Sequence, residues 1–236
     1  RPVPWWSHHL SDPASEREGA GRMYHAKHES APGEADGYVS YRLKEGWGPS
    51  SLPMNELQVL DLAAADPGVY KALWDYVLGT DLCQTISCWR GRVDEPLRWL
   101  LSDPRRLEVK ALVDDLYLRL LDVPRALAAR AYGAAGELAM QVHDIFPVPG
   151  EARYLLCSDP TATPTGGGQP GAQCSPTSRD PDLELGIDRL AAAYLGGVSF
   201  ATLAAAGRVR ELTPGAVARA DAMFATAVAP YCPTMF

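Results

Sequence analysis

Residues 66–79 read DPGVYKALWDYVLG and contain both ends and the buried face of one helix. Asp66 is suited to accept hydrogen bonds from the free N–H groups at a helix start, and Pro67 fits the first helical position. Gly79 is expected to end the helix in a left-handed conformation. The apolar residues between these ends recur at helical spacing and predict one buried face. They are Val69, Tyr70, Leu73, Trp74, Val77 and Leu78.

Strands are predicted on both sides of this helix. Val39, Tyr41 and Leu43 alternate with polar residues, which is typical of a half-buried strand. The other expected elements are strands at residues 57–62 and 84–89 and a short helix at residues 96–101. Residues 11–37 are rich in Pro, Gly, Ser and Glu and predict a loop. Residues 37–110 therefore alternate strand and helix, as in an α/β or α+β layer.

The alternation of elements restarts near residue 111. Leu116, Leu118 and Leu120 share one face of an expected strand, and Leu183 and Leu185 alternate with the polar Asp182 and Glu184 in another. Further expected elements are strands around residues 138–142 and 154–156, a helix between Asp122 and Gly133, and three final helices opened by Asp188, Ser199 and Thr213. Strands followed by helices predict an α+β domain at residues 111–236.

Two further segments are predicted to lack regular structure. Residues 161–178 are rich in Pro, Thr and Gly and contain a glycine triplet at residues 166–168. No apolar strand precedes this triplet and no helix follows it, so it predicts a turn or a mobile loop rather than a phosphate-binding loop. Residues 229–236 contain Pro230 and Pro233 and are expected to run extended.

Composition narrows the classes of partner. The 236 residues carry 22 basic and 29 acidic side chains, for a formal net charge of -7. No Lys/Arg stripe stands out, so nucleic acid is not an expected partner. No apolar run of about 18 residues is present, so the sequence predicts no membrane span. The chain opens with Arg1 rather than Met, which leads us to expect further sequence upstream.

The cysteines and histidines give weak chemical signals. Five scattered cysteines form no disulfide framework and are consistent with a reducing cytoplasm. Cys83 and Cys88 are interpreted as buried strand thiols, with half of a metal site as the alternative. Four histidines are interpreted as surface residues, with metal binding as the alternative: His8, His9, His25 and His28. His143 is interpreted as solvent-facing or locally hydrogen-bonded.

An ordered series of short motifs resembles one family. The motifs are LWDY (73–76), GTD (79–81), DEPL (94–97), LLSD (100–103), DLYLRLLDVPRAL (115–127), AY (131–132), YLGG (194–197), LAAAGRV (203–209) and a final Phe236. In this order and spacing they resemble the enhanced-intracellular-survival N-acetyltransferases, which acetylate amines, including those of aminoglycosides. The resemblance covers nearly the whole chain.

The resemblance implies a domain organisation with a different role for each domain. Family members have an N-terminal GNAT domain that carries acetyl-CoA, a second GNAT-like domain without cofactor, and a domain similar to sterol carrier protein. Residues 1–110 would be part of the second GNAT-like domain and residues 111–236 the sterol-carrier-like domain, an α+β architecture. Acetyl-CoA would be bound by an N-terminal domain missing from this chain, which alone is not expected to be active.

A GNAT cofactor loop of the form Arg/Gln-x-x-Gly-x-Gly/Ala is not evident in the sequence. The backbone N–H groups of such a loop, placed before a helix, hold the pyrophosphate of the cofactor. The nearest string is EREGAG at residues 16–21, which has the wrong first residue and lies in a polar segment. The residues therefore do not predict cofactor binding by this chain.

The resemblance also implies functional positions. The α-carboxylate of Phe236 would be the general base that deprotonates the amine substrate, and Trp6 and Met235 would line the acceptor pocket. A free terminal carboxylate has a pKa of about 3.5, so burial would have to raise it. Trp5 is the alternative for the register of Trp6. The structural alternatives are that Trp6 is an ordinary core or interface residue and that the chain end at Phe236 is a frayed terminus.

Two other functions remain open at this stage. The sterol-carrier-like domain is interpreted as a scaffold, but an apolar tunnel of several hundred cubic ångströms would instead indicate a lipid-binding module. The other alternative is a purely structural assembly unit. Family members tend to form symmetric oligomers, so the full-length protein is expected to be a homo-oligomer. The expected substrate is a small-molecule amine, without nucleic acid or membrane as a partner.

Overall fold

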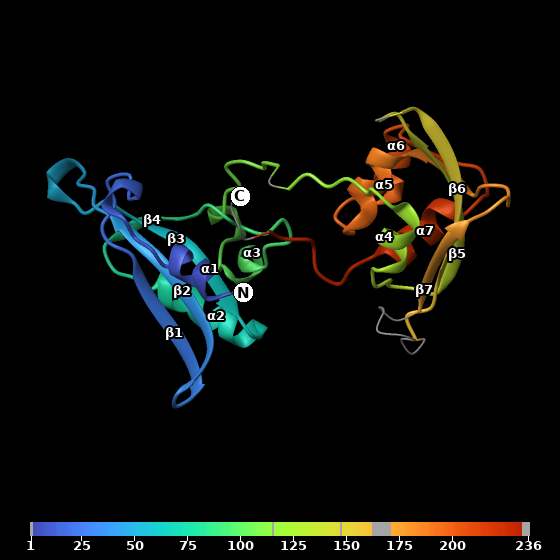
Figure 1. Cartoon of the computed structure of the whole chain (residues 1–236). Coiled ribbons are helices and arrows are strands. Elements are labelled where there is room, and N and C mark those ends of the chain that lie inside the picture. Colours follow the sequence, from blue (N-terminus) through green and yellow to red (C-terminus); the bar gives the residue numbers. More distant parts are fainter. Residues whose placement is uncertain (1, 115, 147, 162–170, 233–236) are drawn as a thin grey trace. The chain divides into compact units, whose positions relative to one another are not determined.

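The fold consists of two compact units, the first ending at Leu112 and the second running from Val113 to Cys232 (Figure 1). A computed structural model describes residues 2–114, 116–146, 148–161 and 171–232. Each unit has its own sheet and its own hydrophobic core. The expected α+β class is confirmed.

The first unit contains a four-stranded sheet in the order β1-β2-β3-β4. Its strands are β1 (Tyr24–Ala31), β2 (Glu34–Lys44), β3 (Asn55–Ala64) and β4 (Cys83–Cys88). The first three pair antiparallel through short connections, whereas β4 pairs parallel with β3. A parallel pair requires a crossover, and α2 (Pro67–Leu78) supplies it. The other helical segments are α1 (Val3–His9), α3 (Leu97–Leu100) and three short 3-10 turns.

Helix α2 forms as its sequence predicts. The Asp66 carboxylate accepts hydrogen bonds from the N–H groups of Gly68 and Val69, and Pro67 is the first helical residue. Four residues of the predicted face are buried against β2 and β3, namely Val69, Leu73, Trp74 and Val77. Leu78, also predicted on this face, is exposed, and Tyr70 is half-buried. The expected left-handed cap is wrong, because Gly79 has φ -82 and ψ -1.

Gly37 in β2 allows α2 to lie close to the sheet. A Cβ atom at this position would stand 2.5 Å from Val69 Cγ1 and 3.1 Å from Leu73 Cδ1. Gly37→Ala is therefore expected to lower the free energy of unfolding by about 1–3 kcal/mol, the usual cost of overpacking. Urea denaturation followed by tryptophan fluorescence measures this loss, because all six tryptophans lie in the first unit. The control is Gly91→Ala, whose added methyl meets nothing within 4 Å; equal stability of the two variants would contradict the close approach.

The segment before β2 is the first departure from the sequence prediction. The composition of residues 11–37 predicts a loop, but they contain all of β1 and the start of β2. Strand β1 is an edge strand with His25, Lys27 and Glu29 exposed, so it lacks the apolar alternation that marks a strand. Ser40 and Arg42 are buried in β2 as well, because the N-terminal segment covers them. Arg42 pairs with Asp12 at 2.8 Å and donates to the Glu16 carbonyl at 2.9 Å.

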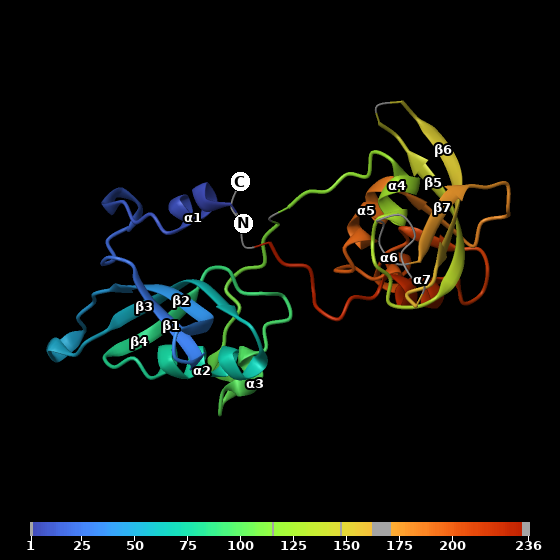
Figure 2. The same cartoon turned by 60° about the horizontal axis from the view of Figure 1, so that its bottom comes forward.

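The second unit contains a five-stranded sheet in the order β7-β6-β5-β8-β9. The strands are β5 (Gly136–Asp144), β6 (Gly150–Ser158), β7 (Ala172–Pro176), β8 (Leu183–Gly186) and β9 (Val209–Glu211). Only the β5–β8 pair is parallel among these. The helices are α4 (Val123–Ala128), α5 (Ile187–Tyr194), α6 (Phe200–Ala205) and α7 (Ala216–Phe224). Helices α5, α6 and α7 lie on one face of the sheet (Figure 2).

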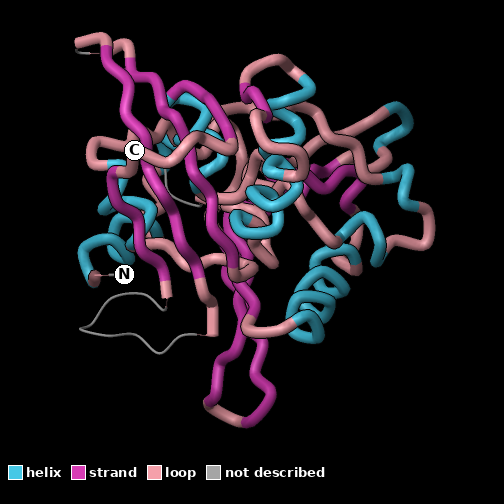
Figure 3. The backbone as a smooth tube through the Cα atoms, turned by 90° about the vertical axis from the view of Figure 1, so that its right-hand side faces the viewer, coloured by secondary structure: helices cyan, strands magenta, loops and turns pink. Residues whose placement is uncertain are grey.

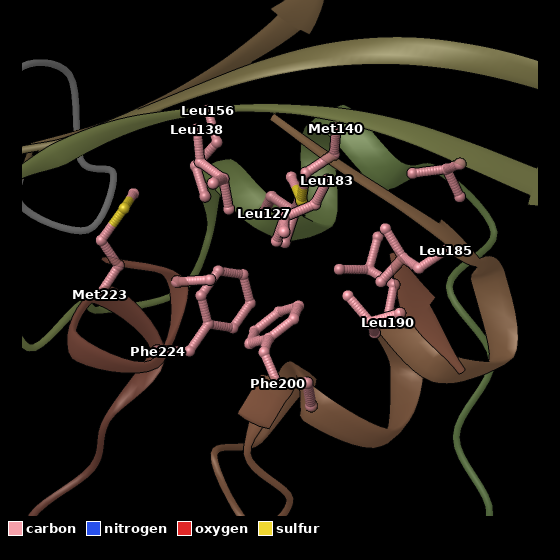
Figure 4. Packing of buried hydrophobic residues seen from close by; sticks show 14 of the residues in the cluster. Leu127, Leu138, Met140, Leu156, Leu183, Leu185, Leu190, Phe200, Met223 and Phe224 are labelled. Carbon is pink, nitrogen blue, oxygen red and sulfur yellow. The ribbon is translucent and has the colours of Figure 1, made fainter. Parts of the chain in front are cut away.

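Side chains fill the space between this sheet and its helices. Leu138, Met140 and Leu183 point down from the strands toward Phe200 and Phe224 from the helices (Figure 4). The aromatic rings of Phe200 and Phe224 meet edge to face with centroids 4.9 Å apart. Figure 4 thus shows a packed core between the sheet and the helices. The lipid-binding alternative is therefore not favoured over a scaffold.

Several elements of the second unit differ from expectation. Leu116, Leu118 and Leu120 lie outside the described strands, which Figure 3 draws in magenta. Strands β7 and β9 are not predicted by the sequence, and β7 falls within the expected loop at residues 161–178. The glycine triplet at residues 166–168 lies outside the described residues. Gly186 rather than Asp188 is the N-cap of α5, whereas Ser199 caps α6 as predicted.

Candidate functional site

Helix α1 places two tryptophans on the first unit. Trp6 is half-buried and meets the rings of Trp5 and Tyr38 edge to face, with centroids 5.0 and 6.2 Å away. Trp5 stacks on the His9 imidazole at 4.4 Å. Both candidates for the pocket tryptophan therefore belong to one aromatic cluster, in which Trp6 is the one beside the sheet residue Tyr38.

Asp61 of β3 joins this cluster to the sheet. Its carboxylate lies 2.8 Å from His9 Nε2 and accepts a hydrogen bond of 2.5 Å from the Tyr38 hydroxyl. The His9 contact holds α1 against the sheet, so it also fixes the position of Trp6. The side chain of Asp61 is 13% exposed, and a carboxylate so placed needs the partners that it has here.

A β-bulge turns Asp61 toward α1. Ser40 lies opposite Asp61, but the next residue of β2, Tyr41, lies opposite Val59. Leu60 is therefore an extra residue in β3. Because successive side chains of a strand point to opposite faces, the bulge brings Asp61 onto the face of Ser40 although Val59 packs against α2.

His25 extends this polar face to the edge strand. His25, Ser40 and Asp61 lie directly opposite one another across β1, β2 and β3, and His25 Nδ1 is 2.8 Å from Ser40 Oγ. A serine-histidine-aspartate triad requires the carboxylate to orient the histidine that serves the serine. Here Asp61 bonds His9 instead, so the row does not form such a triad.

Trp6 is the residue of this cluster that the sequence predicts, whereas its partners were missed. Tyr38, Ser40 and Arg42 alternate with apolar residues, so the sequence could have predicted a polar face on this strand. The bulge that adds Asp61 to this face has no sequence mark of its own. Met235 and Phe236, the other two expected site residues, lie outside the described residues.

The start of α2 does not fit a pyrophosphate. It is the strand-to-helix junction at which a helix N-terminus would present free N–H groups to an anion. Those of Gly68 and Val69 already donate to the Asp66 carboxylate, and Pro67 has no N–H group. The negative charge of Asp66 would also repel phosphate.

The loop at residues 16–21 offers no better cofactor site. Gly19, Ala20 and Gly21 line an open depression of about 380 Å³ together with the acidic Glu45 and the side chains of Tyr24, Leu43 and Asn55. A carboxylate in the lining disfavours phosphate. That residues 16–21 are not a cofactor loop stays a prediction.

The cysteines of β4 differ from their expected burial. Cys83 is half-buried but Cys88 is exposed, so only the first resembles a buried strand thiol. In the described part of the chain, no three or more His, Cys, Asp and Glu side chains are arranged to hold a metal ion. No helix in the described ranges has the length and apolar character that crossing a bilayer requires.

His143 in β5 is locally bonded, which is one of the expected environments. Its Nε2 lies 3.0 Å from Glu184 of β8, and its Nδ1 lies 3.4 Å from Glu151 of β6. Arg210 of β9 contacts the same Glu184. These side chains form a cross-strand network on the sheet.

Comparison with family models gives the class of this two-unit protein. A model described as an acetyltransferase (GNAT) domain matches residues 1–130, and a sterol carrier protein domain matches residues 123–233. The chain belongs to the GNAT acetyltransferase family, with a sterol-carrier-like domain after the GNAT domain. The resemblance found in the ordered motifs is confirmed.

The individual relatives of the chain include Eis-type N-acetyltransferases. An uncharacterized N-acetyltransferase of Streptomyces avermitilis is 39% identical over 233 residues, covering 98% of this chain and 53% of the relative. N-acetyltransferase Eis of Mycobacterium tuberculosis is 32% identical over 194 residues, covering 82% and 43%. The crystal structure of Eis1 from Mycobacterium abscessus matches with a TM-score of 0.78 and 32% identity, covering 100% and 55%. The chain thus spans about half the length of these proteins.

Proposed function

We propose that this chain forms the acceptor side of an acetyl-CoA-dependent amine N-acetyltransferase. The observation that carries the proposal is the Asp66 cap at the start of α2, in a chain that belongs to the GNAT family. Because that junction does not fit a pyrophosphate, acetyl-CoA is bound by a domain outside these residues. The chain alone does not acetylate.

The aromatic cluster of α1 supports an amine as the acceptor. Trp6 and Tyr38 present ring faces and edges beside the carboxylate of Asp61. Aromatic rings and a nearby negative charge favour a protonated amine over a neutral or anionic ligand. Trp6 and Met235 line the acceptor pocket in this proposal.

The α-carboxylate of Phe236 is the proposed general base. An alkyl ammonium has a pKa of about 10 and must lose a proton before its nitrogen attacks a thioester. The carboxylate takes up that proton, and the amine nitrogen then attacks the acetyl carbonyl with loss of the thiol of coenzyme A. A free terminal carboxylate has a pKa of about 3.5, so this role requires an environment that raises the pKa.

Removing Phe236 tests this proposal. In the complete gene product, deletion of Phe236 is expected to lower kcat for acetyl transfer to a primary amine by about 10²-fold, the usual contribution of a general base. Release of coenzyme A thiol measures the rate. The control is Phe236→Leu, which keeps the α-carboxylate in place and is expected to retain most of the activity. Unchanged turnover of the deletion would remove the base assignment.

The proposal also includes the cellular location and the oligomeric state of the enzyme. The five cysteines are scattered along the sequence without the spacing of a disulfide framework, which supports a reducing, cytoplasmic location. The complete protein is proposed to be a homo-oligomer. Exposed apolar side chains on the first unit support this, among them Trp89 and Trp99, which are 87% and 79% exposed.

A further inference from the structure

An open groove of about 470 Å³ lies at one end of the second unit. Three parts of the fold meet there: the start of α4, the ends of β5 and β6 that face each other, and the first residue of α5. All of the lining residues fall between Leu121 and Ile187, so the groove belongs to the second unit alone. Its volume is within the range of small-molecule sites, which is about 300–1,000 Å³.

The floor of the groove is an uncovered edge of the hydrophobic core. Val123, Val142 and Ile187 line the groove and are also buried members of the core cluster. Leu121 adds an exposed apolar side chain to the lining. An apolar group that covers these side chains is removed from water, which favours binding.

The rim of the groove is acidic. Asp122, Asp144 and Glu151 line it, and none of the described lining residues is basic. Asp144 pairs with Arg119 at 2.8 Å, and Glu151 lies 3.4 Å from His143. Of the three carboxylates, Asp122 is the one without an ion-pair partner among the described residues. Negative charge on an apolar groove makes a cation the complementary ligand.

Two helices begin beside the groove, but neither makes it a site for an anion. Free N–H groups at a helix start favour negative charge. At α4, the N–H group of Arg125 already donates to the Asp122 carboxylate at 3.0 Å. At α5, the first turn carries Asp188, whose carboxylate accepts from the Arg189 N–H at 2.9 Å. Both helix starts therefore have an acidic side chain of their own.

Tyr154 adds an aromatic ring and a hydroxyl group to the lining. The residue is half-buried and packs against the core. Burial raises the pKa of this phenol, with smaller contributions from Cys174, Asp122 and Asp144, so the hydroxyl stays protonated at neutral pH. An aromatic ring close to carboxylates favours an ammonium group over a neutral one.

We propose that this groove binds a small organic cation, in which an ammonium group is joined to an apolar ring or chain. The ammonium group lies against Asp122 and the ring of Tyr154, and the apolar part covers Val142 and Ile187. The site is separate from the residues around Trp6 and does not depend on the proposed acetyl transfer. Because N-acetylation removes the charge of an amine, the groove selects the free amine over its acetylated form.

Phenethylamine is a suitable probe, because an alkyl ammonium has a pKa of about 10 and is charged at pH 7. In nuclear magnetic resonance titrations of the whole chain, the amide signals of Ala152, Tyr154 and Ile187 should shift and give a Kd for this groove. Binding near Trp6 does not affect that value, because the readout is local. Phenethyl alcohol and N-acetylphenethylamine carry the same ring without the charge. Both should bind about 5-fold more weakly or worse, the effect of two charges about 4 Å apart in water.

Asp122→Asn tests the residue that selects the charge. Asparagine caps helices about as well as aspartate, so α4 is expected to keep its start. The Kd for phenethylamine should rise about 5-fold or more, while the Kd for phenethyl alcohol stays unchanged and shows that the groove is intact. The control is Asp180→Asn, which changes the net charge equally at a fully exposed side chain outside the groove. It is expected to bind phenethylamine as the wild type does.

Four outcomes would each overturn the inference. They are the absence of groove shifts with phenethylamine, an equal Kd for phenethylamine and phenethyl alcohol, tighter binding of the anionic analogue hydrocinnamate, and an equal loss of affinity in Asp122→Asn and Asp180→Asn. The last of these would mean that the net charge of the chain, rather than Asp122, attracts the cation.

Discussion

Replacing Arg130 by methionine is expected to lower the free energy of unfolding of the second unit by about 3–5 kcal/mol. Arg130 is 9% exposed, and burial lowers the pKa of its guanidinium, although nearby Tyr132 and Tyr194 raise it. Its N–H groups bond the carbonyls of Ala131, Tyr194 and Phe224. Methionine fills a similar volume but leaves these buried acceptors without donors, so the desolvation cost is uncompensated.

The Arg130 variant needs a probe that reports on the second unit alone. All six tryptophans lie at or before Trp99, so their fluorescence reports the first unit. Calorimetry and hydrogen exchange of β5 amides are suitable, and the melting temperature of the second unit should fall by roughly 10–15 °C. The control is Arg125→Met on the exposed side of α4, expected to change stability by less than about 0.5 kcal/mol. A loss below about 1 kcal/mol in Arg130→Met would contradict the proposed structural role.

Arg130 illustrates what the sequence could not predict. A single arginine after a short helix has the same local sequence whether it is solvated or buried. Its role depends on Tyr194 and Phe224, which are 64 and 94 residues away in the chain. By contrast, α2 was predictable almost to the residue, because its cap, its first-position proline and its apolar spacing are all local signals.

Strands were predictable only where one face is apolar. Leu138, Met140 and Val142 alternate with polar residues and form β5 as expected. Strands β1 and β9 carry mostly exposed polar side chains, so they exist through pairing with a neighbour rather than through their own pattern. The reverse holds for Leu116 to Leu120, which have the alternation but lack a partner strand in the described residues.

The candidate site was predictable in part for the same reason. The ordered motifs identified the family, which the comparisons confirm, and Trp6 was named from it. The contacts of Trp6 arise from Tyr38 and Asp61, which only the β2–β3 pairing and its bulge bring to one face. The roles of Met235 and Phe236 stay predictions.

Asp182 is the second residue whose replacement should have a large effect. It precedes β8, where the alternation predicts an outward polar residue, but it is 4% exposed. Its carboxylate accepts a hydrogen bond of 2.9 Å from the Ala139 N–H and lies 3.3 Å from Arg219 of α7. Its carbonyl accepts from the N–H groups of Leu212 and Thr213. One residue thus joins β5, the end of β9 and α7.

Asp182→Asn is expected to lower the free energy of unfolding of the second unit by about 3 kcal/mol at pH 7, because it breaks a buried ion pair. The asparagine amide keeps one acceptor for Ala139 but removes the charge that Arg219 faces. Calorimetry measures the loss. The control is Asp180→Asn in the same loop, whose fully exposed side chain lies 3.8 Å from Arg153 and should contribute little.

The pH dependence of this difference tests the charge itself. Burial alone would raise the pKa of Asp182, but hydrogen bonds from Ala139 and Thr213 and the cations of Arg219 and Arg179 together lower it below the ordinary value. The unfolded chain, with a pKa of about 3.9, therefore binds the proton first as pH falls. The stabilisation is full above about pH 5 and is lost as pH falls through 3.9 toward the native pKa. The difference in unfolding free energy between wild type and Asp182→Asn should accordingly stay constant from pH 8 to 5 and become smaller below about pH 4. If the difference does not depend on pH, the loss comes from altered hydrogen-bond geometry and not from the lost charge.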